Sequence, residues 1–135
     1  LDNNLIRIDA SRMKMKLDHL VPISSQVREM LLELKRVAVG DLVFPGRSRT
    51  RSITTDSLRV AIRSLGFGID EFTTHGFRHM ASTRLNEMGY RGDLIEKQLA
   101  HRESNNVRAV YNHADYLDDR REMMQSWSDY LMNLK

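Results

Sequence analysis

The chain has 135 residues, of which 41% are hydrophobic and 29% are charged, as is usual for a soluble globular domain. It has no cysteine and no apolar run of membrane-spanning length, which excludes a disulfide scaffold, a thiolate metal site and a membrane protein. The net charge of +3 permits nucleic-acid binding where basic residues are segregated, but does not demand it. We therefore predict one domain over residues 1–135, in the cytoplasm. The chain begins at Leu1 rather than Met, which indicates a piece of a longer protein.

The N-terminal segment predicts a small antiparallel sheet. Two short runs of β-forming residues, 5–8 and 20–23, flank the basic segment 11–16. Pro22 lacks an amide hydrogen, so it is expected on a sheet edge or at the end of the second strand. The segment therefore reads as a β-hairpin with a basic connection.

The middle of the chain predicts two helices joined by a polar connection. The first begins at Ser24 and is closed by Gly40, with apolar residues at helical spacing: Val27, Met30, Leu31, Leu34 and Ala38. Residues 42–44 are expected to form a brief strand or extended piece, before a basic loop at 47–51. The second helix is capped by Thr54, Thr55 or Asp56 and ends at Gly66, with an apolar face made of Leu58, Ala61, Ile62 and Leu65.

The second half predicts a central helix from about Thr74 to Gly89 and three shorter or terminal helices. Asp93 followed by Glu96 signals the start of one, residues 105–110 suggest another, and the last begins near Leu117. The last helix carries an apolar stripe that must bury against this domain or a second copy: Met124, Trp127, Leu131 and Leu134. The fold class is therefore α+β and mostly helical, with a small antiparallel sheet at the N-terminal end.

The segment 73–79, at the start of the central helix, contains most of the candidate functional residues of that helix. His75, Arg78 and His79 occur at i, i+3 and i+4, so they share one helix face, while Phe77, Ala81 and Met88 recur on the opposite side as a stripe suited to a core. Arginine binds phosphate with two parallel hydrogen bonds, and a helix N-terminus attracts anions. The face is thus a candidate anion site, although a solvated helix start is the simpler interpretation of this string alone.

Three chemistries could use these residues. A metal site is disfavoured because Arg78 places a fixed positive charge between the two histidines and no third ligand is suitably spaced. A nucleotide cradle is disfavoured because the chain lacks a glycine-rich phosphate motif. Attack by a tyrosine on a phosphodiester needs a phenol, cations around the phosphate oxygens and an acid for the leaving oxygen. Tyr111, the basic residues and a loop lysine meet that need, and we expect no metal or other cofactor.

Four segments together resemble the signature boxes of the tyrosine recombinases, specifically the integrases of phages and prophages. They are His75-Gly-Phe-Arg78-His79, Gln98-Leu-Ala-His101, Val107-Arg-Ala-Val-Tyr111 and the hairpin segment 12–22 with its lysines. The resemblance covers nearly the whole chain, and four boxes in order are far more specific than any one of them. The family's first catalytic arginine would lie before this chain, as would its separate DNA-binding domain.

The resemblance implies a role for each matching residue. Tyr111 would be the nucleophile that forms a 3′-phosphotyrosyl link to DNA. Arg78 would hold the scissile phosphate, with His75 and His101 bonding the same oxygens or moving protons. Lys14 would be the general acid on the departing 5′-oxygen, with Lys16 as the competing choice.

It also implies double-stranded DNA as the partner and a homo-oligomer, a tetramer on DNA, for the longer protein. The basic residues expected to contact DNA are Arg12, Lys16, Arg47, Arg49, Arg51 and His79. Simpler roles remain open: Tyr111 as a half-buried tyrosine like Tyr90, Tyr116 and Tyr130, and His79 as a packing partner. His19 and His113 are expected at the surface, and Arg120 and Arg121 are expected to balance nearby acids.

The implied activity is site-specific DNA recombination. A type IB topoisomerase shares the phosphotyrosine chemistry and remains an alternative, as does a DNA-binding module without cleavage. The fragment by itself is expected to be inactive, because the catalytic set is incomplete without the first arginine.

Overall fold

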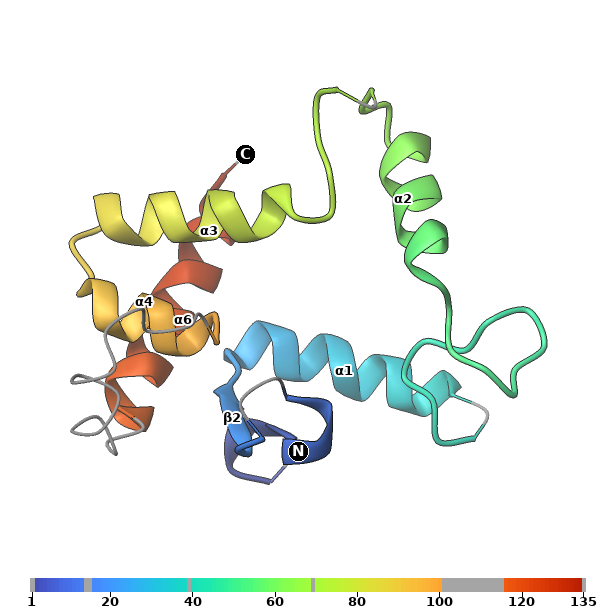
Figure 1. Ribbon diagram of the computed structural model, residues 1–135, viewed down its shortest axis with the longest axis horizontal. Helices are drawn as coiled ribbons and strands as arrows, with labels where there is room; N and C mark the ends of the chain where they lie inside the picture. Colours follow the sequence, from blue (N-terminus) through green and yellow to red (C-terminus); the bar gives the residue numbers. More distant parts are fainter. Residues whose placement is uncertain (1, 14–15, 39, 69, 101–115, 135) are drawn as a thin grey trace. The chain divides into compact units, whose positions relative to one another are not determined.

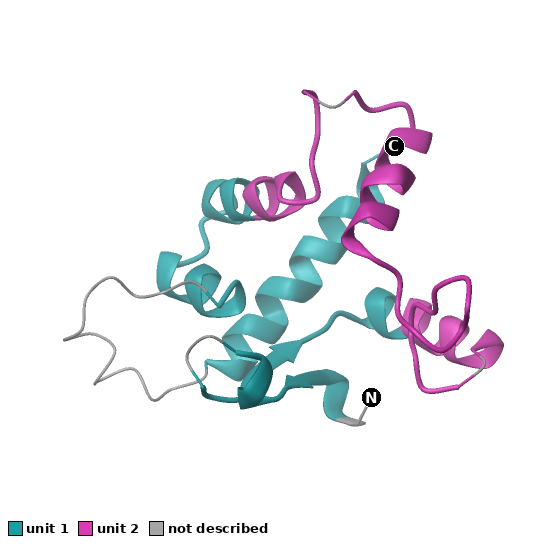
Figure 2. Ribbon diagram, turned by 45° about the vertical axis from the view of Figure 1, so that its right-hand side comes forward, with its two compact units in different colours: residues 1–28, 82–135 teal, residues 29–81 magenta. Residues whose placement is uncertain are grey.

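The computed structural model describes residues 2–13, 16–38, 40–68, 70–100 and 116–134. Within them lie five α-helices and one two-stranded antiparallel sheet (Figure 1), which confirms the predicted α+β, mostly helical class. The chain divides into two compact units (Figure 2). Unit 1 comprises residues 1–28 and 82–135, and unit 2 comprises residues 29–81.

The sheet in unit 1 is the predicted hairpin. Strand β1 (Leu5–Ile8) pairs antiparallel with β2 (His19–Pro22), in a register that places Leu5 opposite Pro22 and Ile8 opposite His19. Pro22 is the last residue of its strand, as its missing amide hydrogen predicts. Short 3-10 helices, Asp2–Asn4 and Ala10–Arg12, precede β1 and follow it.

The core of unit 1 joins three helices. They are α4 (Gly92–Gln98), α6 (Leu117–Asn133) and the C-terminal part of α3 (Gly76–Glu87). The buried cluster at their contact consists of Leu85, Leu94, Ile95 and Met123. Helix α6 also contacts β2, so the last helix docks within its own unit, one of the two arrangements expected from the sequence.

The predicted orientation of the last helix is partly wrong. Met124 and Trp127 pack against the core as expected, but Leu131 and Leu134 are 39% and 60% exposed. The buried positions of α6 are instead Arg120, Met123 and Ser128. The contacts with α4 and β2 therefore select a different face of the helix from the one that hydrophobicity alone selects.

Two polar residues of unit 1 are buried, although His19 was predicted at the surface and Arg120 was predicted to balance nearby acids. Arg120 is 0% exposed, donating from Nε to the Gln98 side-chain oxygen (2.9 Å) and from Nη2 to the Leu20 carbonyl (2.6 Å). His19 is 8% exposed, with its Nε2 lying 3.4 Å from the Gln98 carbonyl oxygen. Burial of a charged or polar side chain requires hydrogen-bond partners, and here strand β2 and the end of α4 provide them. Arg121, in contrast, pairs with Asp118 as predicted.

Of the two helix boundaries predicted around residue 90, the end of α3 is confirmed and the start of α4 is wrong. Gly89 ends α3 with a φ of 85°, and the Tyr90 amide donates to the Leu85 carbonyl (3.1 Å), the bond of a Schellman cap. The next helix begins earlier than predicted, with Arg91 rather than Asp93 at its N-cap. Asp93 instead forms an ion pair with Arg91.

In the middle of the chain, the predicted helices exist, but their apolar faces are only partly buried. Helix α1 (Ser25–Val37) has no buried residue, and Val27 and Met30 are exposed. Helix α2 (Thr55–Ser64) buries Ile62, whereas the other residues of its predicted apolar face are exposed: Leu58, Ala61 and Leu65. Amphipathic spacing produces a helix, but burial also needs a second surface within the unit.

Two further predictions for unit 2 need correction. Residues 42–44 form no strand, which was one of the two forms expected there, and the pairing nearby is a single antiparallel bridge between Pro45 and Ser52. Phe77 is 51% exposed, and its ring meets the edge of Phe72 at a centroid distance of 4.7 Å. In the described part of the chain, no helix is both long and apolar enough to cross a membrane.

Candidate functional site

The N-terminal turn of α3, in unit 2, carries three basic residues at helical spacing, and two of their side chains are in contact. The helix begins at Gly76 rather than near Thr74, so His75 lies just before it. The His75 carbonyl nevertheless accepts from the amides of Arg78 (3.1 Å) and His79 (3.2 Å), which extends the helical spacing to His75. The two imidazole rings are 4.5 Å apart between centroids and nearly perpendicular, at 88°. The predicted shared face is therefore present.

The Thr73 hydroxyl and Gly76 determine the conformation of the segment before α3. Thr73 Oγ1 accepts from the Gly76 amide (3.3 Å), as does the Thr73 carbonyl (2.9 Å), so one exposed amide of the helix start is satisfied. A Cβ on Gly76 would lie 2.9 Å from the ring of Phe72. Glycine at this position thus allows the aromatic ring to pack directly on the first residue of the helix.

A surface pocket of about 220 Å³ lies beside this turn. It is lined by three residues of α2 and four that precede α3: Arg59, Ile62, Arg63, Phe72, Thr73, Thr74 and His75. Guanidinium, hydroxyl and imidazole groups all donate hydrogen bonds to oxyanions, and the start of a helix adds a partial positive charge. The pocket therefore suits an anion such as a phosphodiester.

Sequence reasoning missed the two pocket arginines, Arg59 and Arg63. Only the apolar face of this helix was predicted from the sequence. The signal that could have found the two arginines is their i, i+4 spacing, which places them on one side of a helix. Arg59 pairs with Asp56 at 2.9 Å, and both side chains are largely exposed. Arg63 donates to backbone carbonyls of the loop after α2.

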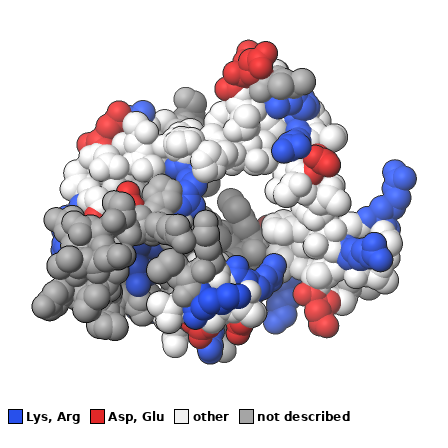
Figure 3. All heavy atoms as spheres, viewed as in Figure 1, with Lys and Arg blue, Asp and Glu red and all other residues white. Residues whose placement is uncertain are grey.

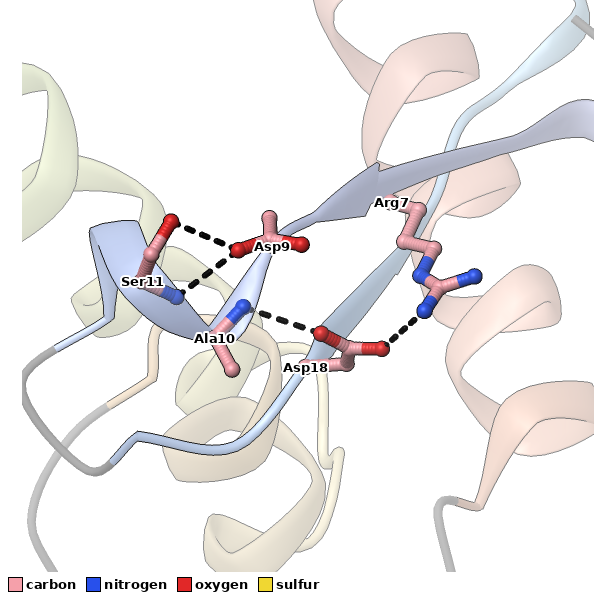
Figure 4. Close-up of polar contacts among 5 residues, drawn as sticks. All are labelled: Arg7, Asp9, Ala10, Ser11 and Asp18. Carbon is pink, nitrogen blue, oxygen red and sulfur yellow. Dashed lines mark hydrogen bonds and ion pairs between the residues drawn. The ribbon is translucent and has the colours of Figure 1, made fainter.

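The hairpin of unit 1 holds its basic connection in place through Asp18 (Figure 4). The Asp18 carboxylate accepts from the Arg7 guanidinium and from the Ala10 amide (2.9 Å), so it joins β1 to the beginning of the connection. Asp9 accepts from the hydroxyl and the amide of Ser11, and these bonds lower the pKa of Asp9. Arg12 and Lys16 are exposed on this connection.

A second basic loop lies between α1 and α2. Arg47, Arg49 and Arg51 are all exposed, and Figure 3 shows Lys and Arg side chains over this loop at the right of the view. The Gly46 amide donates to the Arg51 carbonyl (2.7 Å), and the Arg49 amide donates to the Gly46 carbonyl (2.9 Å). The three arginines are thus displayed on a hydrogen-bonded turn, with Ser48 and Thr50 between them.

The structure places His75, Arg78 and His79 at helical spacing at the start of α3, with the two imidazole rings in contact, and leaves the other predicted members of the site untested. Lys14, His101 and Tyr111 lie outside the described residues, as does the helix expected at 105–110 and His113. Arg12 and Lys16 belong to unit 1 and are described apart from unit 2. The proposed chemistry requires His75, Arg78, His101 and Tyr111 to converge on one basic cleft, and that convergence stays a prediction. Among the described residues, no three His, Asp or Glu side chains form a group suited to a metal ion.

Comparison with known proteins identifies the family. The phage integrase family model matches residues 1–117. The chain belongs to the phage integrase family. This finding confirms the resemblance carried by the four sequence boxes.

Several relatives in the family are named integrases. The chain is 45% identical over 134 residues to the integrase of Shigella phage Sf6 and to the prophage integrase IntS of Escherichia coli K12, and 43% identical over 148 residues to the integrase of Enterobacteria phage P4. Each match covers 96% of this chain but 34% of the relative. The chain thus spans about a third of the length of these relatives. No solved structure matches it.

Proposed function

We propose that this chain carries catalytic residues of a site-specific recombinase that integrates or excises a phage or other mobile element. The observation that supports this most is the face formed by His75, Arg78 and His79 at the start of α3, beside a pocket that suits an oxyanion. Membership in the phage integrase family supports the same activity. The reaction would take place on DNA in the cytoplasm of a bacterial host.

The proposed chemistry is transfer of a DNA phosphoryl group to a tyrosine. The phenol of Tyr111 gives its proton to His75 or His101 as its oxygen attacks the phosphorus, the bond from phosphorus to the 5′-oxygen breaks, and a 3′-phosphotyrosyl ester forms. Lys14, or Lys16 in its place, gives the proton that the departing 5′-oxygen takes up. The ester keeps the energy of the broken phosphodiester, so the reverse attack by a 5′-hydroxyl rejoins the strand without ATP or a metal.

Three basic residues would stabilise the charge that builds on the phosphate. Arg78 would hold two non-bridging oxygens, with His75 and His101 as further hydrogen-bond donors. Fixed donors of this kind stabilise the transition state most, because charge on the oxygens is greatest there. His79 lies against His75, so it would support that ring and contact DNA nearby.

The remaining basic residues would bind the DNA backbone outside the cleavage point. The Arg47–Arg51 turn is one such surface, and the connection that carries Arg12 and Lys16 is the other. Phosphate contacts of this type position a protein on the duplex without reading its sequence. In the longer protein, we expect a tetramer on two attachment sites.

A suicide DNA substrate, in which the cleaved end diffuses away, tests the nucleophile. The longer protein from which we expect this chain to derive should form a covalent DNA adduct visible on a denaturing gel. Tyr111→Phe should abolish the adduct while DNA binding remains, and Tyr130→Phe, on α6, is the matched control that should keep it. An adduct that survives Tyr111→Phe would mean that another residue attacks the phosphate.

Two outcomes would favour the alternative functions. Adducts and relaxation of supercoiled DNA without strand exchange between two sites would indicate a topoisomerase. DNA binding without any adduct in the longer protein would indicate a binding module. The 135-residue chain alone is expected to bind DNA weakly and to form little or no adduct.

A further inference from the structure

Two arginines on α2, one helical turn apart, line the same pocket but have different partners. Arg59 donates to Asp56 (2.9 Å), and their side chains are 68% and 76% exposed. Arg63 is half-buried, and its Nη1 donates to the carbonyls of Phe67 (3.1 Å), Gly68 and Phe72 (3.0 Å). The charge of Arg63 is therefore used within the protein, on three carbonyls of one loop.

This loop leads directly into the candidate site. Phe72 lies three residues before His75, and its ring packs on Gly76, where a Cβ would come within 2.9 Å of it. The same ring meets the edge of Phe77 at 4.7 Å. Arg63 thus holds the backbone of Phe72 to α2, and the Phe72 side chain contacts the first two residues of α3.

The partners of the two arginines differ in how firmly they fix the side chain. An ion pair between exposed groups is screened by water and salt and holds its members weakly. A guanidinium that donates to three carbonyls at once, of which the Phe72 carbonyl is partly buried, forms charge-assisted bonds, and its removal leaves those carbonyls without this donor. Loss of Arg63 should therefore release the loop, whereas loss of Arg59 should remove a surface charge and little else.

We infer that Arg63 is a positioning residue for the phosphate site at the start of α3. It fixes the backbone of Phe67, Gly68 and Phe72 and, through Phe72, the orientation of the turn that carries the site residues at 75–79. Arg59 supplies positive charge to the same pocket without holding its walls. The inference rests on the proposed function only in that the ligand of this site is a DNA phosphate.

Two matched variants, Arg63→Met and Arg59→Met, test the inference in the 135-residue chain. Each removes one positive charge from the same side of one helix, so a purely electrostatic effect on DNA affinity is nearly equal in both. The first measurement is the nuclear Overhauser effect between the His75 and His79 rings, whose centroids are 4.5 Å apart. We expect Arg59→Met to keep this signal and Arg63→Met to lose it.

The second measurement is affinity for a short DNA duplex at several salt concentrations. Arg59→Met should reduce the slope of log affinity against log salt by no more than about 0.9, the share of one phosphate contact. Arg63→Met should reduce it further, because the contacts of His75 and Arg78 are lost with the charge. We expect its affinity at low salt to fall at least tenfold below that of Arg59→Met.

A folded Arg63→Met protein that keeps the ring signal and binds DNA like Arg59→Met would overturn the inference. If circular dichroism shows that Arg63→Met does not fold, a second variant, Gly76→Ala, tests the link between Phe72 and the start of α3. That variant pushes on the Phe72 ring without changing any charge, so it should weaken the ring signal and lower the affinity; an unchanged ring signal and affinity would reject the link. Because the ring signal is measured without DNA, absence of DNA binding would count against the proposed function alone.

Discussion

Arg120 on α6 donates from its Nε to the side-chain oxygen of Gln98 on α4 across 2.9 Å, although no part of Arg120 is exposed. Its Nη2 reaches the Leu20 carbonyl on β2 as well. One buried guanidinium therefore joins the last helix, the end of α4 and the hairpin within unit 1. In sequence, Gln98 and Arg120 flank residues 101–115, which include the proposed nucleophile.

Arg120→Met should destabilise unit 1 by about 2–5 kcal/mol. The substitution leaves the partly buried Gln98 and Leu20 oxygens without this donor, and each unsatisfied group costs about 1–3 kcal/mol. Arg121→Met is the matched control, because its exposed pair with Asp118 contributes about 0–1 kcal/mol. Urea unfolding followed by the fluorescence of Trp127, the one tryptophan of the chain, measures both. Equal midpoints for the two variants would contradict the structural role of Arg120.

Gly89→Ala should destabilise unit 1 by about 1–2 kcal/mol. Gly89 has a φ of 85° with open space around its Cβ position, so the cost is backbone strain rather than a clash. Gly92→Ala provides the control, since its surroundings are equally open and it lies in the first turn of α4 with an ordinary φ. That second substitution should be neutral or stabilising by up to about 1 kcal/mol. Thermal unfolding of the two variants beside the parent chain separates the outcomes.

The Asp9 carboxylate should stabilise the hairpin connection at pH values above the ordinary pKa of an aspartate. In acid, where the carboxylate becomes protonated, this stabilisation should be lost. The hydrogen bonds from Ser11 lower the folded-state pKa of Asp9 below the usual value of 3.8. A lowered pKa means that the folded state prefers the ionised form, so the stabilisation is present above about pH 3.8 and is lost as the pH falls through the folded-state value. The Ser11 amide resonance, followed by NMR from pH 7 to pH 2, should shift with a midpoint below 3.8. A midpoint above that value would show that the bonds do not persist in solution.

Replacing Arg47, Arg49 and Arg51 together by glutamine should weaken DNA binding and make it less dependent on salt. Each phosphate contact that is lost lowers the slope of log affinity against log salt by about 0.9. A control that replaces Arg84 and Arg121 removes charges already paired with Glu87 and Asp118, so it should change the slope less for each charge removed. Fluorescence anisotropy of a labelled duplex gives both slopes. An equal loss for each charge in the two variants would mean that the turn attracts DNA only through net charge.

The sequence determined the local elements because their signals are local. Apolar spacing, the Thr54 cap and the terminal Gly89 depend on residues within a few positions of one another, and the corresponding helices are present. The strand pairing followed from two short β-forming runs separated by a polar connection, with Pro22 at the end of the second strand. The shared face of His75, Arg78 and His79 followed from helical spacing for the same reason, even though the helix begins two residues later than predicted.

Only the tertiary structure decided which faces are buried and which charges act inside the protein. Arg120 and His19 look like surface residues in sequence, and their burial depends on acceptors supplied by residues far along the chain: the Leu20 and Gln98 carbonyls and the Gln98 side chain. Arg59 and Arg63 look equivalent at i and i+4, yet one pairs with an exposed aspartate and the other binds three carbonyls of a loop. The physical reason is that the free energy of burying a polar group depends on the partners that the fold brings to it, which no local pattern specifies.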